Sequence, residues 1–137
     1  MRFGVCVLNE KTARKEAESL LKELIKYLKL EGWKVKLTVA SGSLEGDMGH
    51  AIVGYEYRVA HIKIDPDAHE TMDDLRKTVA HELLHVVLSP IHAAVDIVES
   101  ALDKGDPVSR IMVESFRQAE ERIISHLEET GYPLGKE

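Results

Sequence analysis

The residues His81, Glu82 and His85 lie in "TVAHELLHVVL", one of the most apolar stretches of the chain. Burying two imidazoles and a carboxylate without partners is costly, so something must compensate them. On a helix, residues four apart project from the same face one turn apart, so the two imidazoles can bind one metal ion. Glu82 is offset by about 100° around the axis, which lets its carboxylate reach a water on that ion without being a ligand. The spacing therefore predicts a metal site that activates water.

This HExxH pattern is typical of zinc hydrolases, and its surroundings suit a zinc site. Thr71 followed by Asp74 resembles a capping box, which predicts a helix from Met72 to about Leu88, before Pro90. The apolar flanks of the pattern exclude water from a metal. We expect a catalytic Zn²⁺ with His81 and His85 as ligands and Glu82 as general base. The alternative is a core helix whose histidines are simply hydrogen-bonded.

A catalytic zinc needs a third protein ligand and a fourth position open to water. The metzincin extension HExxHxxGxxH is absent, because Leu88 and Ile91 occupy its Gly and His positions, and His92 misses by one residue. The peptide deformylase pattern needs a cysteine-containing motif, and the only cysteine, Cys6, is far from the histidines. The remaining source is a glutamate from a later helix.

Four later acids compete for that role: Glu99, Glu114, Glu120 and Glu121. The last predicted helix runs from Val108 to about Thr130, and its apolar side centres near Phe116 and Ile123. Glu120 is the only acid inside that side, so we predict Glu120 as the third ligand. Glu121 stays open as the alternative, because helical-wheel angles scatter and helix boundaries shift.

The rest of the chain supplies the elements that position this helix. Periodicity and turn residues predict a strand at residues 2–9, an amphipathic helix from Thr12 to Leu30 and a strand from Trp33 to Ala40. A flexible hairpin or flap at "SGSLEGDMG" follows, and then the strands "HAIVGYE" and "YRVAHIKID" (residues 57–65). After the HELLH helix, a helix at residues 91–102 precedes the last one. With 137 residues the chain suffices for one compact core, so we expect residues 1–137 to form one α+β domain.

Composition limits the partners and the compartment. Eighteen basic against 24 acidic residues give a net charge of -6, and no dense basic tract follows a phosphate backbone, so nucleic acid is not an expected partner. The single cysteine excludes a disulfide within the chain. The apolar run at the start is too short for a signal peptide or a membrane span, so we expect a cytoplasmic protein without a membrane partner.

The order of these features resembles the minimal gluzincin-like zinc metallopeptidases of the zincin fold, which include small phage and prokaryotic proteins. HELLH carries the resemblance, and "EERIISHL", Glu120 to Leu127, looks like their glutamate-helix segment. The resemblance covers about residues 12–127 and implies a small, mostly antiparallel sheet, a backing helix, an active-site helix and a C-terminal glutamate helix. Larger gluzincins brace a histidine with an acid four positions after the glutamate ligand. Here position 124 is Ile, whereas Glu121 is followed at that spacing by Ser125.

The resemblance implies a peptidase in which zinc acidifies a water and Glu82 takes its proton and delivers it to the leaving amine. Larger relatives stabilise the oxyanion with a Tyr, His or Arg; His61, His92 and Tyr132 are the candidates here. Related zincins bind peptide as an added strand on an edge strand, which would be residues 57–65. Two other functions stay open: a non-catalytic zincin-fold module that binds a metal or a protein partner, and hydrolysis of a non-peptide amide.

Overall fold

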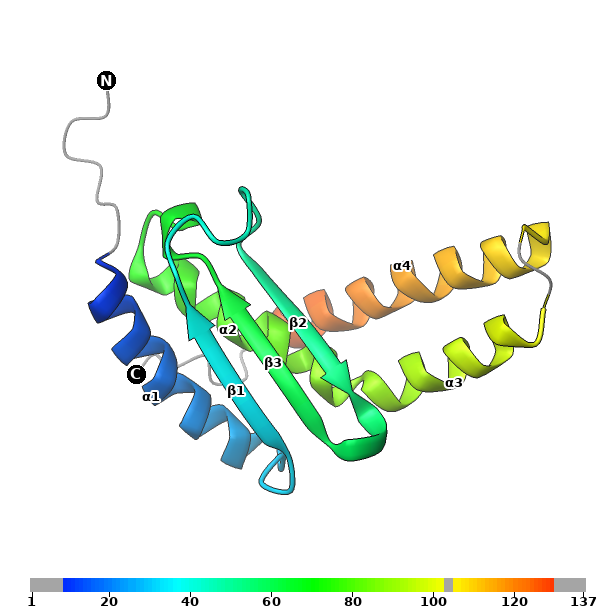
Figure 1. Ribbon diagram of the computed structural model, residues 1–137, viewed down its shortest axis with the longest axis horizontal. Helices are drawn as coiled ribbons and strands as arrows, with labels where there is room; N and C mark the ends of the chain where they lie inside the picture. The colour runs from blue at the N-terminus through cyan, green and yellow to red at the C-terminus, as the bar shows by residue number, and fades with distance from the viewer. Residues whose placement is uncertain (1–8, 103–104, 130–137) are drawn as a thin grey trace.

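The computed structural model describes residues 9–102 and 105–129, which form an α+β fold, as predicted (Figure 1). The elements are α1 (Glu10–Tyr27), β1 (Lys34–Val39), β2 (Gly49–Gly54), the 3-10 helix η1 (Tyr55–Tyr57), β3 (Val59–Ile64), the 3-10 helix η2 (Pro66–Ala68), α2 (Met72–Val87), α3 (Ser89–Ser100) and α4 (Pro107–Glu129). Of the strand predicted at residues 2–9, only Asn9 lies within the described residues, where it caps α1 by accepting a hydrogen bond from the Thr12 N–H.

The three strands form one sheet in the order β1-β3-β2. β1 runs parallel to β3, whereas β2 runs antiparallel to β3, so the sheet is mixed and not mostly antiparallel as predicted. The hairpin predicted at "SGSLEGDMG" is wrong, because β3 separates β1 from β2. The assignment of residues 57–65 as an edge strand is also wrong, because β3 is hydrogen-bonded on both sides. The edge nearest the HELLH helix is β2.

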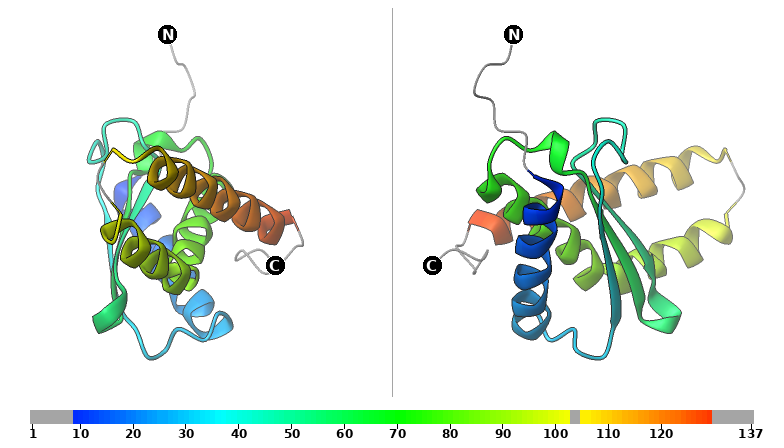
Figure 2. Two further views of the ribbon diagram at one scale, coloured as in Figure 1. Left: turned by 90° about the vertical axis from the view of Figure 1, so that its right-hand side faces the viewer. Right: turned by 60° about the vertical axis from the view of Figure 1, so that its left-hand side comes forward.

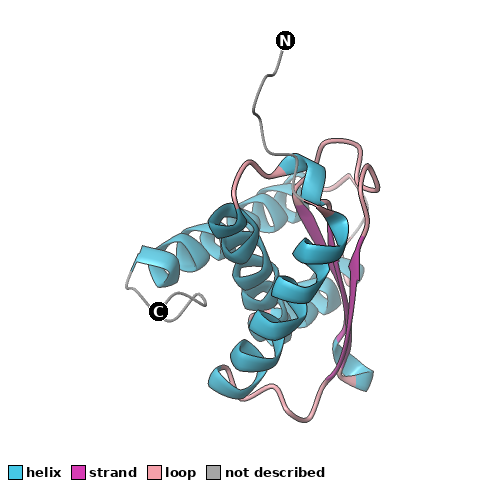
Figure 3. Cartoon of the chain, turned by 90° about the vertical axis from the view of Figure 1, so that its left-hand side faces the viewer, coloured by secondary structure: helices cyan, strands magenta, loops and turns pink. Residues whose placement is uncertain are grey.

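The helices α1 and α2 cover one side of the sheet, and the core lies between them and the strands (Figure 3). The α1 residues that the periodicity places inward are buried, among them Ala13, Ala17, Leu20 and Leu24. They pack with Ile62 and Ile64 of β3 and with Leu75, Val79 and Leu83 of α2. The predicted backing helix is therefore present as α1, although it ends at Tyr27 and not at Leu30.

The helix that carries HELLH begins and ends nearly where the sequence predicts. Thr71 caps it, since its hydroxyl oxygen accepts a hydrogen bond of 3.1 Å from the Asp74 N–H. His69 fastens this end to β3: its ring Nδ1 donates to the Asp65 carbonyl, and its Nε2 contacts the Thr78 hydroxyl, both at 2.8 Å. Burial lowers the pKa of His69, and it outweighs the opposite effects of the Asp65 hydrogen bond and of the Asp74 charge. Neutral His69 thus fixes the start of α2.

Beyond α2 the chain turns by 53° into α3, and α4 returns alongside α3, so that the pair extends away from the sheet (Figures 1 and 2). Pro90 lies in the first turn of α3, where its missing N–H costs nothing. The second half of α4 comes back to α2, where Glu120 and Ile124 are buried. Within the described residues no single helix has the length and apolar character to span a membrane, and only α2 and α3 taken together as a bent pair pass that test.

Candidate metal centre

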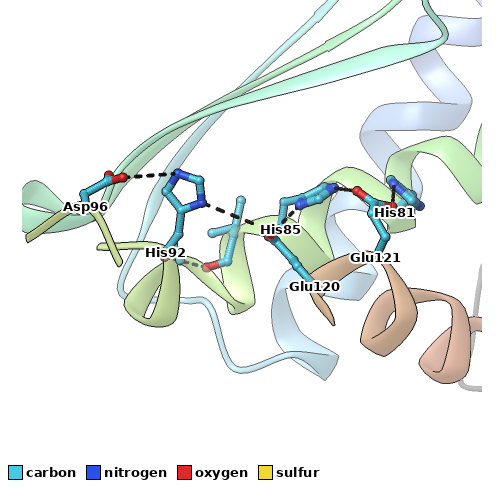
Figure 4. Close-up of polar contacts among 8 residues, drawn as sticks. His81, His85, His92, Asp96, Glu120 and Glu121 are labelled. Atoms are coloured by element: carbon cyan, nitrogen blue, oxygen red, sulfur yellow. Dashed lines mark hydrogen bonds and ion pairs between the residues drawn. The ribbon is translucent and has the colours of Figure 1, made fainter. Parts of the chain in front are cut away.

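His81 and His85 project from α2 toward the glutamates of α4 (Figure 4). The Nε2 atom of His85 lies 3.4 Å from Oε2 of Glu121, and the Nε2 atom of His81 lies 3.6 Å from Oε1 of the same carboxylate. One ligand atom from each of the three residues lies within 4.8 Å of the others. The structure therefore brings together both predicted histidine ligands and one glutamate of the last helix.

The other ring nitrogens of the two histidines are held by two further carboxylates. Nδ1 of His85 donates to Oε2 of Glu120 at 2.8 Å, and Nδ1 of His81 donates to Oε2 of Glu128 at 3.1 Å. An ionised carboxylate only accepts, so each neutral ring carries its proton on Nδ1 and presents a lone pair at Nε2. Outer carboxylates of this kind orient metal-binding histidines and raise their basicity.

The inner contacts fit a cation. With the protons on Nδ1, two Nε2 lone pairs face the Glu121 oxygens at distances longer than a hydrogen bond. Such an arrangement of acceptors is unfavourable unless a positive charge, either a metal ion or a proton on an imidazole ring, lies between them. Two imidazole nitrogens and one carboxylate oxygen are a donor set that zinc takes in catalytic sites. The side chains present thus fit Zn²⁺.

Glu120 and Glu121 take different places in this arrangement. Glu120, the predicted third ligand, has a side chain only 8% exposed and is engaged with Nδ1 of His85. Glu121 is 51% exposed and faces both Nε2 atoms. The geometry therefore favours Glu121, the alternative, over Glu120. Of the other acids considered, Glu114 pairs with Arg117 at the surface, and Glu99 is exposed on α3.

Glu82 is buried beside the cluster, and its carboxylate makes no hydrogen bond to another of the described residues. Burial raises the pKa of Glu82, and Glu121 acts in the same direction, whereas His85, His81 and His50 oppose the shift. The strand β2 passes directly over it: a Cβ on Gly49 would lie 3.2 Å from Cγ of Glu82 and 2.6 Å from Cγ2 of Thr78. Only glycine lets the strand approach this closely.

The cluster opens into a cleft of about 770 Å³. Glu82, His85, Glu120 and Glu121 line one part of it, β2 and η1 form a second wall, and α3 forms a third. The Glu82 carboxylate and the His85 imidazole are therefore accessible to a ligand much larger than water.

The three residues considered for oxyanion stabilisation have different outcomes. His92 lines the cleft, with its Nδ1 4.0 Å from Oε1 of Glu120 and its ring against Phe116. His61 lies on the outer face of the sheet, where Nε2 contacts the Thr38 hydroxyl at 2.7 Å, so it is away from the cleft. Tyr132 lies outside the described residues.

Glu128 is the site residue that the sequence analysis missed. It follows Glu121 by seven residues, two helical turns, and therefore shares its side of α4. The acids at positions 114, 121 and 128 form this seven-residue pattern, which is the signal that points to Glu128. When third-ligand candidates are sought only on the apolar side of the helix, Glu128 is not among them.

Comparisons of the chain with known protein families, with curated proteins and with solved structures gave no match.

Proposed function

We propose that the protein is a zinc-dependent hydrolase, and specifically a small metallopeptidase. The observation that carries this proposal is the arrangement around Glu121: two Nε2 lone pairs and a carboxylate converge, while Glu120 and Glu128 hold both Nδ1 atoms. We assign His81, His85 and Glu121 as the zinc ligands. Two of them, His85 and Glu121, line the open cleft. Three protein ligands with an open fourth position fit a catalytic zinc site, because a structural zinc is enclosed by four protein ligands.

Bound zinc supplies an acidified water and polarisation of the scissile carbonyl. Glu82 is the general base, because it is buried at the cleft, bears no hydrogen bond to another described residue, and is next in sequence to a ligand. Its carboxylate takes the proton of the attacking water and then passes it to the leaving amine. A purely structural metal site has no use for such a carboxylate, so Glu82 favours catalysis over the non-catalytic module.

We assign peptide binding to the edge of β2. The N–H of Asp65 donates to the carbonyl of Met48, and in an antiparallel pair the bonded positions alternate. The backbone groups of Ala51 and Val53 therefore point away from β3 and are available to an added strand. Their side chains lie on the same face as α2, so a peptide paired there passes alongside the cleft.

His92 is the candidate for the oxyanion donor, because it lines the cleft with Glu82 and His85. Of the two other candidates from the sequence, His61 is on the outer face of the sheet and Tyr132 lies outside the described residues. Cytoplasmic location stays a prediction from the sequence.

The experiment is zinc content and peptide cleavage for the wild type, Glu82→Gln, Glu121→Gln and Glu120→Gln. We expect Glu82→Gln to keep zinc and lose cleavage, and Glu121→Gln to lose most of its affinity for zinc. Glu120→Gln keeps a weaker site, because the amide oxygen still accepts from Nδ1 of His85. Zinc lost in Glu120→Gln but retained in Glu121→Gln contradicts the ligand assignment. Zinc binding without cleavage by the wild type favours the non-catalytic module.

A further inference from the structure

The cleft that holds Glu82 and His85 continues past the end of β2, between η1 and α3. Tyr55 and Tyr57 of η1 line one side of this part, and Ala93 and Ile97 of α3 line the other; the acidic residues Glu56 of η1 and Asp96 of α3 also line the cleft. We call the four uncharged residues, Tyr55, Tyr57, Ala93 and Ile97, the distal apolar subsite.

The side chains of the distal apolar subsite are unusually exposed for their type. Tyr57 is 80% exposed and Ile97 is 71% exposed, although both border the same hollow. Tyr55 is braced from behind by the Trp33 ring, whose centroid lies 6.4 Å away. Large apolar side chains gathered on facing walls of an open cleft leave apolar surface in water that a ligand can cover.

The position of the subsite relative to the catalytic residues follows from β2. Gly49, the first residue of β2, lies against Glu82, and Tyr55 follows directly after the last residue, Gly54. At about 3.3 Å per residue, η1 lies roughly 15–20 Å along the strand from Glu82. A peptide paired with β2 advances at the same rise, and every second side chain points toward the cleft.

We propose that the distal apolar subsite binds a bulky apolar side chain of a peptide substrate, about five or six residues from the scissile bond. The proposal rests on the proposed peptidase function and specifies the class of peptide. The occupant is an extended segment carrying Leu, Ile, Phe or Tyr at that distance, since these side chains cover the exposed walls of η1 and α3. Polar or very small side chains at that position gain nothing from the subsite.

The first test is the cleavage profile of the full-length zinc-loaded protein on a library of decapeptides. We expect one position, about five or six residues from the cut, to be enriched in large apolar residues. Ile97→Asp lowers kcat/KM for such peptides by about tenfold and removes the enrichment, because a charge replaces half of the apolar contact. Ile111→Asp is the matched control, since Ile111 is 66% exposed on α4 but does not line the cleft.

The second test does not depend on catalysis. Methyl signals of labelled isoleucines are followed by NMR while a capped decapeptide with one leucine, or its glycine counterpart, is added with and without zinc. We expect the leucine peptide to shift the Ile97 signal and not the Ile111 signal, and the glycine peptide to shift neither.

The outcomes separate the two proposals. Cleavage without an apolar preference at that distance, or with equal losses in Ile97→Asp and Ile111→Asp, overturns the subsite and leaves the peptidase standing. If no variant cleaves any peptide, the peptidase proposal fails and the NMR titration decides the subsite. An Ile97 signal that responds equally to the leucine and glycine peptides overturns it.

Discussion

Glu120 and Glu128 determine how well His81 and His85 are oriented. Each carboxylate accepts the Nδ1 proton of one ring, and this bond fixes both the tautomer and the direction of Nε2. A histidine without such a partner rotates more freely and is a weaker ligand. In the proposed metal site, the orientation of both histidine ligands therefore depends on two side chains that are not assigned as ligands.

We predict that Glu120→Gln and Glu128→Gln each weaken zinc binding by about tenfold, at the lower end of the range for outer-shell changes. Glu129→Gln is the control, because Glu129 is exposed at the end of the same helix. The dissociation constant is measured by competition with a chelator of known affinity. Unchanged affinity in both variants would show that the two carboxylates do not orient the ligands.

The grouping of the motif residues was predictable from the sequence, whereas the helical wheel did not favour Glu121, the glutamate that faces both Nε2 atoms. His81, Glu82 and His85 follow from spacing alone, because a helix fixes their relative positions. The helical wheel locates Glu120 on the buried side of α4, and it is indeed buried. Burial, however, suits Glu120, the residue that holds Nδ1 of His85. Glu121, which faces the Nε2 atoms beside the open cleft, is half-exposed. Apolar periodicity does not separate these two roles.

At the scale of elements, the closeness of β2 to α2 depends on Gly49. We predict that Gly49→Ala destabilises the protein by about 1–3 kcal/mol, because the added methyl meets Thr78 and Glu82 and pushes the strand away. Cleavage falls as well, since the edge of β2 and Glu82 move apart. Chemical denaturation and peptide cleavage measure the two effects.

The matched control for this variant is Gly32→Ala. A Cβ there would lie 3.4 Å from the end of the flexible Arg58 side chain, an ordinary contact. Equal destabilisation by the two substitutions would mean that the approach of β2 to α2 is not the cause.

The junction between β3 and α2 makes stability depend on pH through His69. Its pKa is lowered in the folded protein, so below the ordinary value of 6.5 the unfolded chain takes up the proton first. The stability that neutral His69 contributes is complete above that pH and is lost as the pH falls toward the folded-state pKa. We predict that the difference in unfolding free energy between wild type and His69→Gln shrinks between about pH 7.5 and pH 5.

That comparison is made in the presence of a chelator, so that metal release does not contribute. The two proteins differ only at position 69, so contributions from the rest of the chain cancel in the difference. A difference that stays constant over this pH range would show that folding does not lower the pKa of His69.

Element boundaries followed from the sequence more closely than the order of the strands did. Thr71, Asp74 and the apolar spacing are local signals, and α2 begins at Met72 as predicted. Strand order is not local: alternation tells which face of β3 is buried but not which strands lie beside it. The antiparallel β2 pairs on the far side of β3 from β1, and no single stretch of sequence encodes that choice.

At the scale of the whole molecule, the proposed metal centre joins two parts of unequal burial. α2 has eight buried residues, whereas α4 buries only Ser109, Glu120 and Ile124 among the described residues. The pairs that His81 and His85 form with Glu120, Glu121 and Glu128 are among the contacts that join α4 to α2. A metal held by His81, His85 and Glu121 links the two helices directly.

We predict that removing zinc loosens α4 while α1 and α2 stay protected. Zinc at a hundred times its dissociation constant stabilises the folded state by about 2.7 kcal/mol, and a chelator removes that gain. Hydrogen exchange measured with and without chelator should show faster exchange in α4 around Ile124 and little change around Leu83. Uniform acceleration throughout the chain would mean that the metal supports the whole fold and not the docking of α4.

Zinc anomalous diffraction from crystals of the full-length protein grown with zinc tests the ligand assignment most directly. We predict one dominant peak, bonded to Nε2 of His81, Nε2 of His85 and a carboxylate oxygen of Glu121, with Glu120 and Glu128 still on the Nδ1 atoms. A peak bonded to Glu120 in place of Glu121, or no peak between the two histidines at saturating zinc, would contradict the assignment.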